Sequence, residues 1–190
     1  MAKKASKNKE SKHKKREEKL FYKKESAWKT FSEKQRKEAS TLSEEYKAFL
    51  KESKSERGCI KQIEKMLKKH GFKNIVDVKK AKTGDKIYKK FKEKSIIASV
   101  IGKDKSSIRM IGSHVDSPRL DLKPNPLYED SDLALLQTHY YGGIKKYHWV
   151  NVPLMLTGVV FTSEGKRLDI TIGDKESDPC FVISDLLPHL

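Results

Sequence analysis

Residues 111–118, IGSHVDSP, form the most informative stretch of this chain. They follow an apolar run, residues 108–111, that predicts a buried strand. Gly112 and Ser113 are small residues that end this strand and leave His114 and Asp116 near its carboxyl end. Open α/β sheets place their reactive groups at that edge. The stretch therefore predicts a functional site at the end of a strand.

A histidine and an aspartate two residues apart can serve one metal site. A metal-binding imidazole is neutral, and it binds the ion through one nitrogen while an acceptor holds the other. Asp116 is close enough in sequence to be that acceptor for His114. The alternative is an ordinary hydrogen-bonded loop, and the short motif alone does not exclude it.

Three segments give this pair a wider context. They are residues 111–126 (IGSHVDSPRLDLKPNP), 138–149 (THYYGGIKKYHW) and 185–190 (DLLPHL). From about Ser26 onward the chain resembles the aspartyl aminopeptidase and aminopeptidase I family of zinc metallopeptidases. In its bacterial members these segments occur in the same order and at comparable spacing. The chain resembles only the N-terminal portion of the members of that family.

The resemblance implies a site with two metal ions, zinc by preference, with cobalt or manganese as substitutes. It implies His114 as one metal ligand and Asp116 as the catalytic carboxylate behind it. His189 is implied as a further metal ligand or substrate contact, and a solvated histidine is an equal alternative. Such a site lowers the pKa of a bound water and polarises the peptide carbonyl. The implied reaction removes the N-terminal residue from peptide substrates.

Members of that family are much longer than 190 residues. Their bridging aspartate, their Glu-Glu pair and their later Asp and His ligands have no counterpart in this sequence. We therefore expect the chain to be an N-terminal fragment of such an enzyme that is inactive alone. A non-catalytic interaction or assembly module with a basic tail is the alternative function.

The charge of the chain is concentrated at its start. Residues 1–24 contain eleven Lys or Arg and three Glu, a net charge of +8, which is half of the total of +16. Such a segment predicts a disordered, solvated tail, because few apolar residues offset the entropy lost on ordering. Non-specific nucleic-acid binding through this tail is the weaker alternative.

No apolar run is long enough to span a membrane, and the tail lacks the apolar core of a secretory signal. The two cysteines, Cys59 and Cys180, form neither a metal motif nor a disulfide framework. We therefore expect a cytoplasmic protein that does not cross a membrane.

Local patterns predict an α/β fold. Residues 26–50 are expected to be helical, and Ser53 with Glu56 forms a capping-box signature for a second helix that ends at Gly71. An extended piece is expected at residues 74–78, and strands at residues 86–91, 95–101, 106–111, 152–162 and 167–172, with a further short one at 181–183. Residues 124–126, Pro-Asn-Pro, predict a stiff link.

These patterns and the resemblance together predict three segments: a basic disordered tail (1–24), the N-terminal part of a mixed-sheet, zinc-peptidase-like catalytic domain (25–122), and the first part of a mostly β lid and dimerisation domain (123–190). The resemblance implies a homo-oligomer formed through the lid domain. We expect His139 and His148 to have structural or interface roles.

Overall fold

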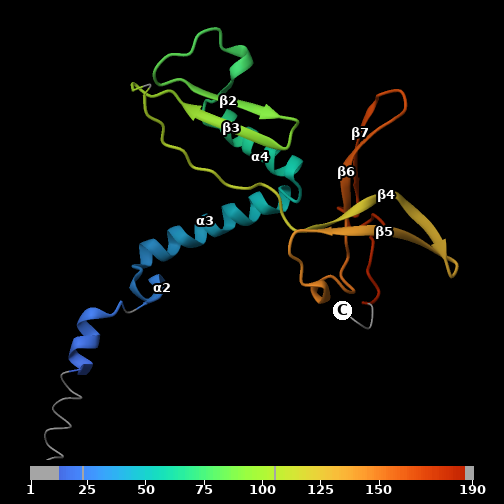
Figure 1. Cartoon of the computed structure of the whole chain (residues 1–190), viewed down its shortest axis with the longest axis horizontal. Coiled ribbons are helices and arrows are strands. Elements are labelled where there is room, and N and C mark those ends of the chain that lie inside the picture. The colour runs from blue at the N-terminus through green and yellow to red at the C-terminus, as the bar shows by residue number, and fades with distance from the viewer. Residues whose placement is uncertain (1–12, 23, 105, 187–190) are drawn as a thin grey trace, which may run out of the picture. The chain divides into compact units, whose positions relative to one another are not determined.

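The computed structural model describes residues 13–22, 24–104 and 106–186 (Figure 1). The chain divides into two compact units between Ala48 and Phe49. No helix among the described residues is both long enough and apolar enough to cross a membrane. The prediction of an α/β fold is confirmed, since helices are followed by small sheets of mixed and antiparallel strands.

The first unit is helical. Residues 13–20, within the predicted tail, form helix, and they are followed by α2 (Ala27–Thr30) and α3 (Glu33–Glu52), which continues into the second unit. The single helix expected over residues 26–50 is thus broken at Phe31, whose backbone is extended. Ser32 and Gln35 form a reciprocal capping box that starts α3, with N···O distances of 3.3 and 2.9 Å.

Helix α4 (Glu56–Lys69) opens the second unit. Its N-cap is Ser55, whose hydroxyl accepts a hydrogen bond from the Gly58 amide at 3.2 Å, so the predicted capping box of Ser53 and Glu56 is wrong. Ser53 and Ser55 both lie at the start of the apolar pattern, and the pattern alone could not distinguish them. The predicted end is confirmed, because Gly71 has a left-handed φ of +81° and the Phe72 amide donates to Leu67 O.

Helix α4 packs on a three-stranded sheet of β1 (Lys73–Asn74), β2 (Lys86–Phe91) and β3 (Ser95–Val100), in the order β1-β2-β3 (Figure 1). Strand β1 is parallel to β2, and β3 is antiparallel to it. The core contains Ile60 of α4 and Tyr88 of β2, which are 1% and 3% exposed. The extended piece expected at residues 74–78 is only β1, because the 3₁₀ turn η1 (Ile75–Asp77) follows, capped by Asn74.

The buried strand predicted over residues 106–111 is wrong. The described residues 106–118 contain no helix or strand. Ile108, Met110 and Ile111 are 80%, 79% and 100% exposed. A strand of this kind is stabilised by hydrogen bonds to neighbouring strands, and no described strand pairs with this segment. Apolar character alone therefore did not place it in a sheet.

Two antiparallel hairpins complete the fold: β4 (Arg119–Asp130) with β5 (Leu133–Tyr141), and β6 (Leu156–Phe161) with β7 (Arg167–Ile172). The predicted link at residues 124–126 lies inside β4, and its two prolines coincide with an interruption of the β4–β5 pairing between Leu122 and Leu127. Strand β7 is confirmed, whereas β6 begins four residues later than predicted. The strand expected at residues 181–183 is reduced to two isolated bridges.

Candidate metal site

The β4–β5 hairpin brings together two segments that are distant in the sequence. Arg119, the first residue of β4, pairs in register with Tyr141, the last residue of β5. Gly142 follows with a φ of +75°, and a Cβ atom there would lie 3.5 Å from the Cα atom of Pro118. The loop that ends at Pro118 therefore lies against the Tyr141–Gly142 backbone. The two residues predicted as the site, His114 and Asp116, are in this loop.

His114 and Asp116 are in direct contact. The His114 Nδ1 atom lies 3.1 Å from Asp116 Oδ1 and 3.0 Å from the backbone oxygen of Asp116. Both partners accept hydrogen bonds when the carboxylate is ionised, so they favour the tautomer with the proton on Nδ1. The Nε2 lone pair is then available for a metal ion, and the His114 side chain is 83% exposed. This is the arrangement that a metal-binding histidine needs.

Tyr141 is a residue of this site that the sequence did not indicate. Its hydroxyl donates to Asp116 Oδ2 at 3.0 Å. This hydrogen bond, followed by those from the backbone of Asp116 and from His114, holds the pKa of Asp116 below its usual value. The same carboxylate raises the pKa of Tyr141. Asp116 is therefore an ionised carboxylate at neutral pH, as an acceptor behind a metal ligand must be.

Arg119 supports Tyr141 from the other side. Its guanidinium carbon lies 4.1 Å from the centroid of the Tyr141 ring. Arg119 forms ion pairs with Asp121, at 2.7 Å, and with Glu56 of α4, at 3.0 Å. The site is thus connected through Arg119 to the first turn of α4.

Of the described residues at this site, His114 can supply one ligand of a zinc ion, and no further ligands lie beside it. Among residues 13–22, 24–104 and 106–186, no three His, Cys, Asp or Glu side chains lie close enough together to hold a metal ion. A structural zinc site needs four protein ligands and a catalytic one usually three. His189 lies outside the described residues. The His139 ring stacks on Tyr140, and His148, in the 3₁₀ turn η2 (Lys146–His148), packs edge-on against Tyr147.

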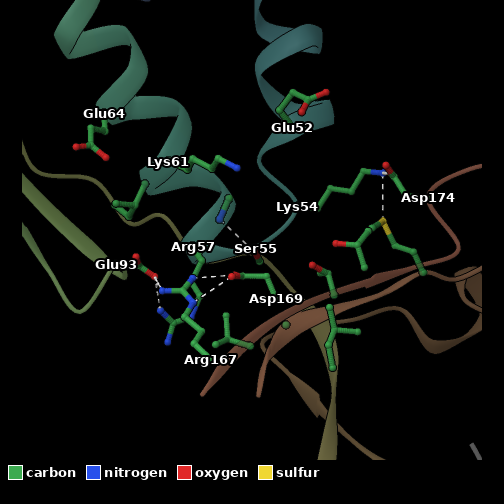
Figure 2. A pocket seen from close by; sticks show the side chains of 18 of the residues that line it. Glu52, Lys54, Ser55, Arg57, Lys61, Glu64, Glu93, Arg167, Asp169 and Asp174 are labelled. Atoms are coloured by element: carbon green, nitrogen blue, oxygen red, sulfur yellow. Dashed lines mark hydrogen bonds and ion pairs between the residues drawn. The ribbon is translucent and has the colours of Figure 1, made fainter. Parts of the chain in front are cut away.

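A separate cavity of about 680 Å³ lies between the start of α4 and the β6–β7 hairpin (Figure 2). In Figure 2 the guanidinium groups of Arg57 and Arg167 meet at the Glu93 carboxylate, with N···O distances of 3.0 and 2.7 Å. Arg167 also pairs with Asp169 at 2.7 Å, and Lys54 with Asp174 at 3.4 Å. Most of these charges are paired with each other. The cavity is therefore lined by a network of ion pairs that joins the β6–β7 hairpin to α4.

Arg167 and Asp169 are two residues apart and therefore lie on the same face of the strand, so the sequence contains a signal for their ion pair. Glu93 lies 74 residues from Arg167 and has no such signal.

Comparisons with known proteins agree with the fold. The family described as Aminopeptidase I zinc metalloprotease (M18) matches residues 49–190. The probable M18 family aminopeptidase 1 of Clostridium acetobutylicum is 44% identical over 170 residues, and the match covers 86% of this chain and 37% of that protein. The protein of the same name from Thermotoga neapolitana is 46% identical over 156 residues, covering 82% of this chain and 34% of that protein.

Solved structures show the same relationship. The crystal structure of aminopeptidase I from Borrelia burgdorferi B31 superposes with a TM-score of 0.80 at 42% identity, covering 86% of this chain and 41% of that one. The structure of an M18 aminopeptidase from Thermotoga maritima gives a TM-score of 0.79 at 41% identity and covers 90% of this chain and 37% of that one.

The family model, the curated relatives and the solved structures all carry the description aminopeptidase. The chain belongs to the Aminopeptidase I zinc metalloprotease (M18) family, and it spans little more than a third of the length of the curated relatives that it matches.

Proposed function

We propose that the chain is the N-terminal part of a metal-dependent aminopeptidase that removes N-terminal residues from peptides. The observation that supports this function is the contact of His114 Nδ1 with Asp116 in a side chain that is 83% exposed and whose Nε2 has no hydrogen-bond partner among the described residues. Membership of the M18 family supports zinc as the metal, since the family is described as zinc metalloproteases. Cobalt and manganese are proposed as substitutes.

In this proposal His114 binds one metal ion through Nε2, and Asp116 is the catalytic carboxylate that orients the imidazole. His189 is the proposed second residue, as a ligand or as a substrate contact. A zinc ion bound in such a site lowers the pKa of a water molecule and polarises the substrate carbonyl. Asp116 remains ionised, so it keeps the His114 proton on Nδ1 throughout.

The remaining ligands and the general-base carboxylate are proposed to come from polypeptide beyond these 190 residues. A single imidazole with a carboxylate behind it does not hold a catalytic metal tightly. We therefore expect the 190-residue chain to be inactive when isolated. The exposed segment 106–111 supports this view, because exposed apolar side chains such as Ile108, Met110 and Ile111 are typical of a surface that further polypeptide covers.

We further propose the three-part organisation predicted above. Residues 25–122 would belong to the catalytic domain, and residues 123–190 to a lid and dimerisation domain through which the protein forms a homo-oligomer. The two hairpins β4–β5 and β6–β7 support a mostly β character for the second part. The free thiols of Cys59 and Cys180 support a cytoplasmic location. Residues 1–24 would remain a basic tail.

The test is an assay of the polypeptide encoded by the complete reading frame that contains these 190 residues. A panel of peptides with free N-termini is incubated with Zn²⁺, Co²⁺ or Mn²⁺, and the released amino acids are identified. We expect release that a chelator abolishes and that His114→Ala reduces to the background. Absence of release with all three metals would overturn the proposed function.

The second candidate is a non-catalytic assembly module, and exposed apolar side chains favour it. Ile108, Met110 and Ile111 are exposed. Leu127 and Leu133 of the β4–β5 hairpin are exposed as well, at 71% and 59%. Such side chains are typical of a surface that another chain covers. Light scattering of the 190-residue protein tests this second candidate, because a folded monomer at all concentrations would exclude self-assembly.

A further inference from the structure

The two oxygens of the Asp116 carboxylate have different partners. Oδ1 lies 3.1 Å from His114 Nδ1, and Oδ2 accepts the hydroxyl proton of Tyr141 at 3.0 Å. A carboxylate that is held at one oxygen can still rotate about its side-chain bonds. Holding both oxygens fixes the plane of the group and therefore the direction in which Oδ1 faces the imidazole.

Tyr141 is itself held on two sides. Its backbone is paired with Arg119 at the end of the hairpin, and the Arg119 guanidinium covers its ring at 4.1 Å. The Arg119 side chain is only 25% exposed and is fixed by its ion pairs with Glu56 and Asp121. The hydroxyl of Tyr141 is thus placed by packing that does not involve Asp116.

We propose that Tyr141 is a positioning residue that, through Asp116, selects the His114 tautomer with the proton on Nδ1 and so presents Nε2 to a metal ion. The part of this inference that concerns metal rests on the proposed function. The part that concerns the tautomer does not, because it follows from the three side chains of this chain.

The backbone oxygen of Asp116 also lies 3.0 Å from His114 Nδ1. Loss of the Tyr141 hydroxyl therefore leaves one acceptor in place, and the expected effect is a partial shift of the tautomer population. The matched control is Tyr140→Phe, because Tyr140 is the neighbouring tyrosine of β5 and stacks on His139 instead.

The experiment measures the tautomer of His114 by ¹⁵N NMR of the imidazole in the 190-residue protein at about pH 8. We expect Tyr141→Phe to raise the fraction with the proton on Nε2 at least twofold, and Tyr140→Phe to leave it unchanged. Identical His114 ¹⁵N shifts in Tyr141→Phe and the unsubstituted protein would overturn the inference.

Arg119→Gln provides a second variant in case Tyr141→Phe does not fold. It removes the cation from the Tyr141 ring and keeps all three members of the hydrogen-bonded set. We expect a smaller shift of the same sign, and an unmoved tautomer in a folded Arg119→Gln protein would contradict the inference. The readout involves no metal and no peptide, so a failure of the proposed aminopeptidase function would be seen separately, in the release assay.

Discussion

Arg119 and Tyr141 are register partners across β4 and β5, and the Arg119 guanidinium lies 4.1 Å from the centre of the Tyr141 ring. The same guanidinium forms ion pairs with Glu56 and Asp121. Arg119 therefore links α4 to the end of the hairpin where His114 and Asp116 lie.

Replacement of Arg119 by Ala should destabilise the protein by about 1–3 kcal/mol, because it removes a partly buried charge with two ionic partners and a cation–π contact. The free energy of unfolding by urea measures the change. Lys146→Ala is the control, since its ammonium lies 5.4 Å from the Tyr140 ring and no ion pair is found for it among the described residues. Equal effects of the two substitutions would contradict the special role of Arg119.

Glu64 of α4 should make stability depend on acid pH. Burial alone would raise the pKa of Glu64, but hydrogen bonds from Lys90, Tyr88 and Lys68 outweigh it and lower the pKa to about 2, from an ordinary value of 4.5. A carboxylate with a depressed pKa in the folded state adds stability above its unfolded pKa, and this stability is lost as pH falls toward the folded value.

The unsubstituted protein should therefore lose stability between about pH 5 and pH 2 more steeply than Glu64→Gln. Thermal unfolding followed by circular dichroism across this range measures the difference. The matched control is Glu44→Gln on α3, whose carboxylate pairs with Lys47 in an exposed position. The account of Glu64 fails if the difference in stability between the unsubstituted protein and Glu64→Gln is constant with pH.

Gly142 should resist substitution while its neighbour Gly143 tolerates it. Gly142 has a φ of +75° and approaches Pro118, whereas a Cβ at Gly143 would meet no atom within 4 Å. Gly142→Ala should cost about 1 kcal/mol or more, because an L-residue is strained at this φ. Gly143→Ala should change the unfolding free energy by less than about 0.5 kcal/mol. A reversed order would show that Gly142 does not adopt this left-handed conformation.

The elements that local patterns predicted well are those whose signals lie within one segment. The end of α4 is encoded by Gly71 and Phe72 in succession, and β2, β3 and β7 by short runs that contain β-branched residues and lie between turns. The β4–β5 hairpin was missed because Pro124 and Pro126 suggested a break, whereas the structure accommodates them in one strand by interrupting the pairing there.

In the candidate site too, the contacts within one segment could be predicted and those between distant segments could not. The spacing of His114 and Asp116 was sufficient to predict their contact, because two residues apart in a loop they can reach each other. Tyr141 could not be predicted, since its contact with Asp116 depends on the register of a hairpin that joins residues 25 positions apart. The strand at residues 106–111 was mispredicted for a related reason, because burial depends on neighbours that lie elsewhere in the sequence.

The central claim is that His114 is a metal ligand of an aminopeptidase, and one comparison tests it most directly. The protein from the complete reading frame and its His114→Ala variant are titrated with Co²⁺ while the visible absorption of the ion and the release of N-terminal residues are both recorded. The account predicts a bound-cobalt spectrum with peptide hydrolysis in the first protein, and at least a tenfold loss of cobalt affinity with no hydrolysis in the variant. Equal cobalt spectra and equal release in both proteins would contradict it.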